Sequence, residues 1–230
     1  MKTRRQFLGH GMGAALAASA ATIATAATTS AAPANDAART TPSAGGDLLS
    51  RMTWLNPPAK EFYDSGSITA RSKGKTDFWR KTFYGYITDN GHFLHAPAGA
   101  EFMFQARVNG NYSQLYDQAG LMVRLDEKHW LKCGSEYFEG QRWASVVVTH
   151  DFSDWSTMED LSQNGAVYWR ILRKKDSLEA QCSKDGEKYT TVRQAYFPPG
   201  VPVEVGVMCA APEGSGFDVT FDQLELSQLK

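Results

Sequence analysis

The feature that most constrains this chain is a repeated alternation of apolar and polar residues, which runs from about residue 52 almost to the end. Alternation with a period of two places successive side chains on opposite faces of a strand. Several of the runs are separated by dipeptides that supply the positive φ angles of tight hairpin turns. These are Asn90-Gly91, Asn109-Gly110, Asn164-Gly165 and Asp185-Gly186. No window in this part of the chain sustains the 3.6-residue period of an amphipathic helix, so the pattern predicts an all-β domain.

The alternating runs predict about a dozen short antiparallel strands. We expect them near residues 52–55, 67–72, 77–84, 92–96, 101–108, 118–125, 129–138, 141–149, 166–173, 177–183, 187–195, 202–210 and 217–227. So many strands without an intervening helix favour a single β-sandwich or jelly roll over residues 48–230.

The first 30 residues resemble a twin-arginine signal peptide. Thr3-Arg4-Arg5 is followed by Phe7-Leu8 and then by an Ala-rich, mildly apolar run. This resemblance implies export in the folded state, to the periplasm or the exterior. Residues 31–47 are mostly Ala, Thr, Ser, Pro and Gly, a composition that buries too little surface to offset ordering and predicts a flexible linker.

Charge and cysteine content exclude several classes of protein. The chain carries a net charge of −1, and loss of the basic signal peptide makes it more acidic, so we expect no nucleic-acid partner. No later stretch approaches the roughly 18 apolar residues of a membrane span. Three cysteines form at most one disulfide. Cys133 and Cys209 lie in apolar strand patterns typical of buried thiols; Cys182 is less certain, and the sequence does not reveal the redox state of the three.

The register of the three middle strands follows from their turns. A loop at Asp126-Glu127-Lys128 and a two-residue turn at Glu139-Gly140 fix which residues face each other. The expected cross-strand pairs are Gln118–Glu136, Met122–Lys132, Arg124–Trp130, Glu136–Trp143, Lys132–Val147 and Trp130–Thr149. A slip of one residue would turn Arg124, Lys132 and Glu136 into the core, where unpaired charge is costly.

This register sorts the side chains onto two faces. One face is aliphatic and is expected to form the core: Leu121, Val123, Leu131, Cys133, Ala144, Val146 and Val148. The other face carries two indoles and several charges. Aromatic rings stack on the C–H faces of sugars, and Arg, carboxylate and amide groups bind their hydroxyls. We therefore predict ligand-binding residues on this face: Gln118, Arg124, Trp130, Lys132, Glu136 and, in support, Asp117 and Trp143.

An outer sheet face with cross-strand ion pairs explains the same residues equally well. Asp77, for example, is as suitable for a structural ion pair with Arg124 or Arg80 as for a ligand contact. If the face binds a glycan, Trp130→Ala is expected to abolish binding and leave folding nearly intact.

Several motifs resemble a known family. They are Phe78-Trp79-Arg80, the stretch from Tyr116-Asp117-Gln118-Ala119-Gly120 to Arg124, Trp130-Leu131-Lys132 with Gly134 and Glu136-Tyr137, and Ser153-Asp154-Trp155-Ser156. Together they are similar to the uncharacterised regulation-of-enolase-type family of the concanavalin A-like lectin/glucanase superfamily, over about residues 52–226. The resemblance implies a jelly-roll β-sandwich with a concave sheet. It implies no particular activity.

The sequence favours a non-catalytic glycan-binding module over an enzyme. The Glu-x-Asp-x-x-Glu motif of the superfamily's glucanases is absent, and so are metal, phosphate and cofactor motifs. The alternative is a hydrolase or lyase that uses Glu136 as acid/base, paired with Asp117 or Asp77. A protein-interaction scaffold is a third possibility, and the oligomeric state stays open.

Overall fold

The computed structural model describes residues 44–229, so the expected signal peptide at 1–30 and most of the expected linker lie outside the described residues. The described part begins with a short helix, α1 (Ala44–Ser50), inside the range expected as linker. Leu48 and Leu49 of α1 are buried in the main core. These two leucines end the small-residue composition of the linker, and their burial explains why ordered structure begins a few residues earlier than expected. Among residues 44–229, no helix is long and apolar enough to cross a membrane.

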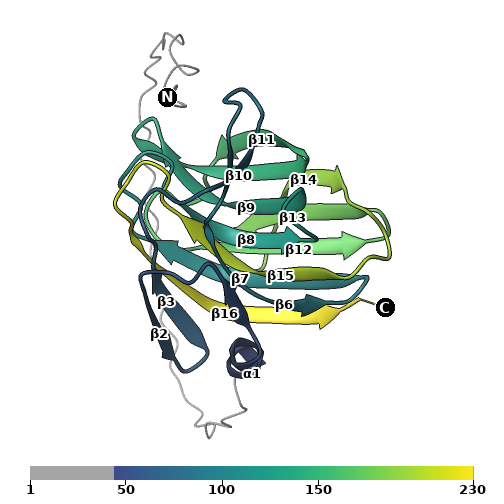
Figure 1. Ribbon diagram of the computed structural model, residues 1–230. Coiled ribbons are helices and arrows are strands. Elements are labelled where there is room, and N and C mark those ends of the chain that lie inside the picture. The colour runs from purple at the N-terminus through teal and green to yellow at the C-terminus, as the bar shows by residue number, and fades with distance from the viewer. Residues whose placement is uncertain (1–43, 230) are drawn as a thin grey trace, which may run out of the picture. The chain divides into compact units, whose positions relative to one another are not determined.

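Two seven-stranded antiparallel sheets pack face to face, as expected for a jelly-roll β-sandwich (Figure 1). Sheet A consists, from edge to edge, of β1 (Thr53–Leu55), β6 (His92–Ala98), β15 (Val203–Ala210), β8 (Gln118–Arg124), β9 (His129–Phe138), β10 (Gln141–His150) and β11 (Phe152–Glu159). Sheet B consists of β14 (Thr190–Tyr196), β13 (Ser177–Ser183), β12 (Val167–Lys174), β7 (Phe102–Gly110), β16 (Asp218–Gln228), β3 (Ser67–Arg71) and β2 (Lys60–Asp64). A separate hairpin pairs β4 (Phe78–Arg80) with β5 (Ile87–Asp89).

Three strands are absent from the sequence prediction: β2, β5 and β11. The side chains of β2 are all exposed, so that strand shows no alternation of burial. Ser153-Asp154-Trp155-Ser156, which has the residues of a turn, instead lies within β11 and pairs with β10. The turn before it is tighter than expected, because Asp151 adopts a φ of 62° and lets the chain reverse directly after β10. The expected strand over 77–84 is correct only for Phe78–Arg80.

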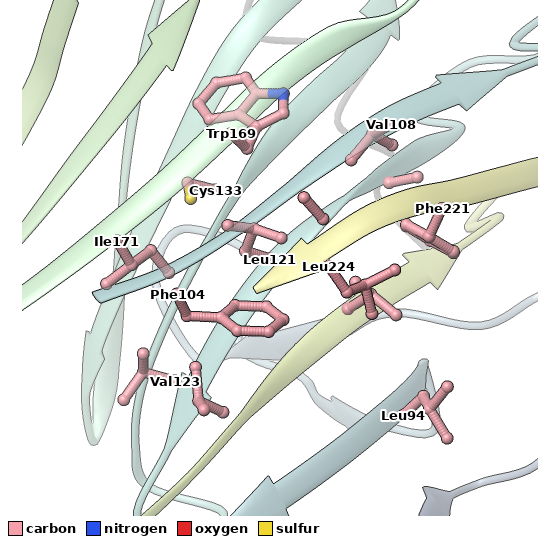
Figure 2. Close-up of a cluster of buried hydrophobic side chains, with 14 of the residues drawn as sticks. Leu94, Phe104, Val108, Leu121, Val123, Cys133, Trp169, Ile171, Phe221 and Leu224 are labelled. Carbon is pink, nitrogen blue, oxygen red and sulfur yellow. The ribbon is translucent and has the colours of Figure 1, made fainter. Parts of the chain in front are cut away.

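The main core lies between the two sheets (Figure 2). All seven residues predicted for the core face of the middle strands are buried there. In Figure 2, Leu121 and Val123 from β8 lie among Phe104, Trp169 and Ile171 from sheet B. Cys133, Cys182 and Cys209 are buried free thiols, and burial raises the pKa of Cys182 and of Cys209 to about 12.

Candidate functional site

The predicted register of the middle strands is correct at every pair. Gln118 faces Glu136, Met122 faces Lys132 and Arg124 faces Trp130 across β8 and β9. Glu136 faces Trp143, and the remaining two pairs likewise match across β9 and β10. The structure therefore brings the predicted binding residues of these strands together on the face of sheet A that points away from the main core.

That face is covered by the chain itself. Phe78 and Trp79 of β4 pack on it and form a second hydrophobic core with Met122, Trp130 and Val147. The ring of Phe78 meets that of Trp130 edge-on, with centroids 6.2 Å apart. Trp130 is 0% exposed. The expectation that its indole stacks on a ligand is wrong, because Phe78 occupies the place that a sugar would need.

The charged residues of this face of sheet A hold the segment that covers it, residues 77–89, in place. Lys132 Nζ lies 3.1 Å from Asp77 Oδ1 and donates to the carbonyl of Phe78 at 2.8 Å. Both guanidinium NH groups of Arg124 donate to the Asp89 carboxylate at 2.8 Å. Asp77 thus pairs with Lys132, whereas the sequence suggested Arg124 or Arg80 as its partner. Both cations form ion pairs, but with Asp77 and Asp89 of the covering segment and not across neighbouring strands of sheet A as the sequence suggested.

Arg80 and Gln118 complete these attachments. Arg80 donates to Asp151 at 2.9 Å, and Gln118 Nε2 donates to Asp77 Oδ1 at 3.3 Å. Asp77, Lys132, Gln118 and Arg80 are all buried. Breaking a buried ion pair leaves an uncompensated charge, so these contacts resist removal of the segment from sheet A.

Glu136 lies beside a very small cavity. Its carboxylate accepts a hydrogen bond from Trp155 Nε1 at 2.9 Å, and the same indole donates to Ser145 Oγ at 3.0 Å. The cavity has a volume of about 10 Å³, and the residues that line it include Gln118, Lys132, Glu136 and Ser145. This volume suits about one water molecule. A sugar ring does not fit next to Glu136 in this conformation, so nothing here favours the hydrolase alternative.

The two supporting residues lie at the margin of the face. Asp117 is buried, and its Oδ2 accepts hydrogen bonds from the backbone N–H groups of Ser113 and Gln114 at 3.0 and 2.8 Å. Burial raises the pKa of Asp117, against the lowering effect of these two bonds. Trp143 is half-buried and stacks on Phe138 at 5.2 Å. The structure thus assigns both residues local packing and bonding roles.

A larger pocket lies elsewhere, at one end of the sandwich. It has a volume of about 400 Å³ and lies where the end of β7, the β9–β10 turn and the loop between β11 and β12 meet. Its lining is rich in amides and glycines: Asn109, Gly110, Asn111, Tyr112, Tyr137, Gly140, Gln141, Arg142, Gln163, Asn164 and Gly165. None of these is a residue that we predicted to bind ligand.

Arg142 forms the fixed base of this pocket. Its guanidinium donates to the carbonyl of Gly165 at 2.7 Å and to Asp160 at 3.4 Å. The side-chain amide of Gln163 bonds to the backbone of Arg142. Its oxygen accepts from the Arg142 N–H, and its nitrogen donates to the Arg142 carbonyl. Arg142 is buried, yet its Nε has no hydrogen-bond partner among the described residues. Because this Nε is itself shielded from solvent, a ligand in the pocket cannot reach it, and Arg142 acts as a structural support.

The remaining amides of the pocket are available to a ligand. Asn109, Asn111, Gln141 and Asn164 are exposed, and their side chains make no hydrogen bond to another residue within 44–229. Among the described residues that line the pocket, Arg142 is the one that carries a charge, and Asp160 balances it. Over the same range, no group of three or more His, Cys, Asp or Glu side chains is arranged to hold a metal ion.

The sequence contained a signal for this pocket that we interpreted only as turns. Glu139-Gly140 forms the expected tight turn, with positive φ at both residues. Asn109-Gly110 instead lies at the end of β7, and Asn164-Gly165 lies in the loop that joins β11 to β12, so neither forms the expected hairpin turn. Their convergence depends on two sheets coming together, which local patterns do not encode.

Comparison with known proteins places this fold in a family. Residues 54–229 match the family described as "Protein of unknown function (DUF1349)". The chain belongs to this family. Within it, the chain is 44% identical over 180 residues to "Regulation of enolase protein 1" of Saccharomyces cerevisiae, which covers 78% of this chain and 90% of the yeast protein.

Solved structures of similar proteins support the fold. A crystal structure of a functionally unknown protein from Saccharomyces cerevisiae superposes with a TM-score of 0.77 at 43% identity, over 79% of this chain and 98% of that one. The carbohydrate-binding module CBM66 from Bacillus subtilis superposes with a TM-score of 0.51 at 11% identity, over 77% of this chain and 97% of that one. At such low identity, the second likeness concerns the β-sandwich alone.

Proposed function

We propose that this DUF1349 protein is an exported, non-catalytic carbohydrate-binding protein whose site is the amide-lined pocket at the end of the sandwich. The observation that carries the proposal is the lining itself. Four exposed amides whose side chains have no hydrogen-bond partner within residues 44–229 line a space of about 400 Å³ above the buried Arg142. This volume falls in the range of about 300–1,000 Å³ typical of small-molecule sites.

The chemistry of the lining suits a neutral sugar. A carboxamide donates and accepts hydrogen bonds, and so does each hydroxyl of a sugar, so the two groups satisfy each other in either direction. The half-exposed ring of Tyr137 adds an apolar surface for the C–H face of a pyranose or furanose. Because Asp160 already balances Arg142, the pocket offers no free cation for a uronic acid.

The fold is compatible with this role, since a β-sandwich of the same kind forms the module CBM66. That likeness supports the proposal only as far as the fold goes; the pocket residues carry the rest. The site differs from the one expected from the sequence, because the face of sheet A that bears Trp130 is covered.

Amide variants of the pocket test the proposal. Asn111→Ala and Gln141→Ala are each expected to weaken binding of a neutral oligosaccharide by about three- to tenfold, since each removes roughly one hydrogen bond. Binding is measured by isothermal calorimetry, after a glycan array has selected the ligand. Gln194→Ala is the matched control, because it removes an exposed amide on β14, away from the pocket lining. No binding to any array member, or equal loss in the control, would overturn the proposal.

A second candidate function is regulation of an enzyme by direct contact. The observation that favours it is the 44% identity to a yeast protein named for regulation of enolase. Purified enolase passed over the immobilised protein separates the two functions. If the protein retains enolase, Asn111→Ala does not change that retention and no glycan on the array binds, the result would support the regulatory function.

A further inference from the structure

The outer edge of sheet B is formed by a short strand whose side chains are all exposed. This strand, β2, pairs with β3 on one side and has no neighbouring strand on the other among residues 44–229 (Figure 1). Phe62 at its centre is 67% exposed. Lys60 and Asp64 at its ends have no ionic partner within the same residues. An exposed strand edge is a template for pairing with another chain.

We propose that two copies of this chain associate by pairing their β2 strands antiparallel about a twofold axis at Phe62. In this register Lys60 of each copy lies opposite Asp64 of the other, and Phe62 lies opposite itself. Glu61 lies opposite Tyr63, whose hydroxyl already donates to Glu61 within one strand at 3.2 Å. Sheet B of one copy then continues into sheet B of the second.

The alternation of faces makes all of these pairs possible at once. Lys60, Phe62 and Asp64 project from one face of β2, and Glu61 and Tyr63 from the other. Antiparallel pairing keeps like faces together, so one face gains two ion pairs around a pair of phenyl rings. Directly opposed residues of opposite charge, and opposed aromatic residues, stabilise such a pairing.

Charged residues on an edge strand usually prevent association, but here their order reverses that effect. The sequence Lys-Glu-Phe-Tyr-Asp carries opposite charges at its two ends, so a second copy running in the opposite direction meets complementary charges. The edge strand β14 lacks this property, because pairing about its centre would place Arg193 opposite itself. On the edge strand β11, Asp154 would face Thr157 and gain no ion pair.

Charge reversal tests the pairing. We expect sedimentation velocity over a concentration series to show a weak, concentration-dependent dimer of the wild-type chain. Lys60→Asp places two carboxylates opposite each other at both ends, and Asp64→Lys places two ammonium groups there. Each variant is expected to raise the dimer dissociation constant by about tenfold or more. Asp154→Lys on β11 makes the same change of charge on another edge strand and should leave the constant unchanged.

Two further samples make the test specific. The double variant Lys60→Asp/Asp64→Lys restores complementary ends and should dimerise like the wild type. An equal mixture of the two single variants should form a heterodimer, because one then carries only acidic and the other only basic ends. Circular dichroism confirms that each variant is folded. A wild type that stays monomeric at every concentration, or a double variant no better than either single one, overturns the proposal.

Discussion

Trp130 shows how burial changes the role of a single residue. Its position on the charged face of sheet A is as predicted, but its indole is part of a second core beneath Phe78. A residue expected to bind a ligand thus contributes to stability. The prediction that its replacement leaves folding intact no longer holds.

Trp130→Ala is now expected to lower the free energy of unfolding by about 3–5 kcal/mol, the usual cost of removing a fully buried aromatic side chain. Urea denaturation followed by circular dichroism measures the loss. Trp143→Ala serves as the control, because Trp143 lies on the same face but is half-buried, and its loss should be smaller. An unfolding midpoint of Trp130→Ala equal to that of the wild type would contradict the packing of Phe78 on this ring.

Asp117 predicts a dependence of stability on pH. Burial raises the pKa of its carboxyl above the ordinary value of about 3.9, so folding favours the protonated form. The stabilising contribution is complete below the ordinary pKa and is lost as the pH rises through the folded-state pKa. Asp117→Asn does not titrate. The wild type should therefore lose stability relative to Asp117→Asn as the pH rises above about 4, as measured by thermal unfolding.

Asp185 serves as a control, because its pKa is shifted in the opposite direction to that of Asp117. Backbone N–H groups of Lys188 and Glu187, with the Ser183 hydroxyl, lower its pKa to about 2. Its contribution is present above the ordinary pKa and is lost as the pH falls toward 2. Between about pH 2 and about pH 4 the wild type should therefore gain stability relative to Asp185→Asn as the pH rises. Parallel pH profiles for the two variants would contradict these assignments.

At the level of elements, the sequence was sufficient wherever neighbouring strands are joined by short turns. The β8–β9–β10 register follows from two turns and from the cost of turning Arg124, Lys132 and Glu136, without partners, into the core between the sheets, and each pair is correct. The predicted core face of these three strands is also correct, because the alternation of apolar and polar residues is enough to assign it.

Long-range contacts are where the sequence was insufficient. The segment that covers sheet A meets Trp130 and Lys132 about fifty positions later in the chain, and no local pattern marks that contact. Its β4 and β5 strands have three residues each, too short for a clear alternation. The amide pocket was missed for a similar reason, because three segments that are far apart in the sequence line it and no local pattern shows that they meet.

At the scale of the whole molecule, the proposed export depends on Arg4 and Arg5, which lie outside the described residues. The twin-arginine route recognises an arginine pair of this kind, so on the proposed route Arg4→Lys/Arg5→Lys is expected to retain the protein inside the cell. Cell fractionation and immunoblotting measure its distribution. Arg39→Lys, a change of the same kind within the expected linker, should not affect export. Equal distribution of the double variant and the wild type would contradict this route.

The covered face of sheet A has a consequence for how specificity changes within such a fold. With both faces of that sheet committed to packing, new contacts to a ligand are most easily gained at the rim, where the 139–140 turn and the 162–165 loop contribute no residue to either hydrophobic cluster. Residues there can be exchanged without repacking either hydrophobic cluster. Transplanting these two short segments between relatives should therefore transfer ligand preference while the scaffold melts at an unchanged temperature.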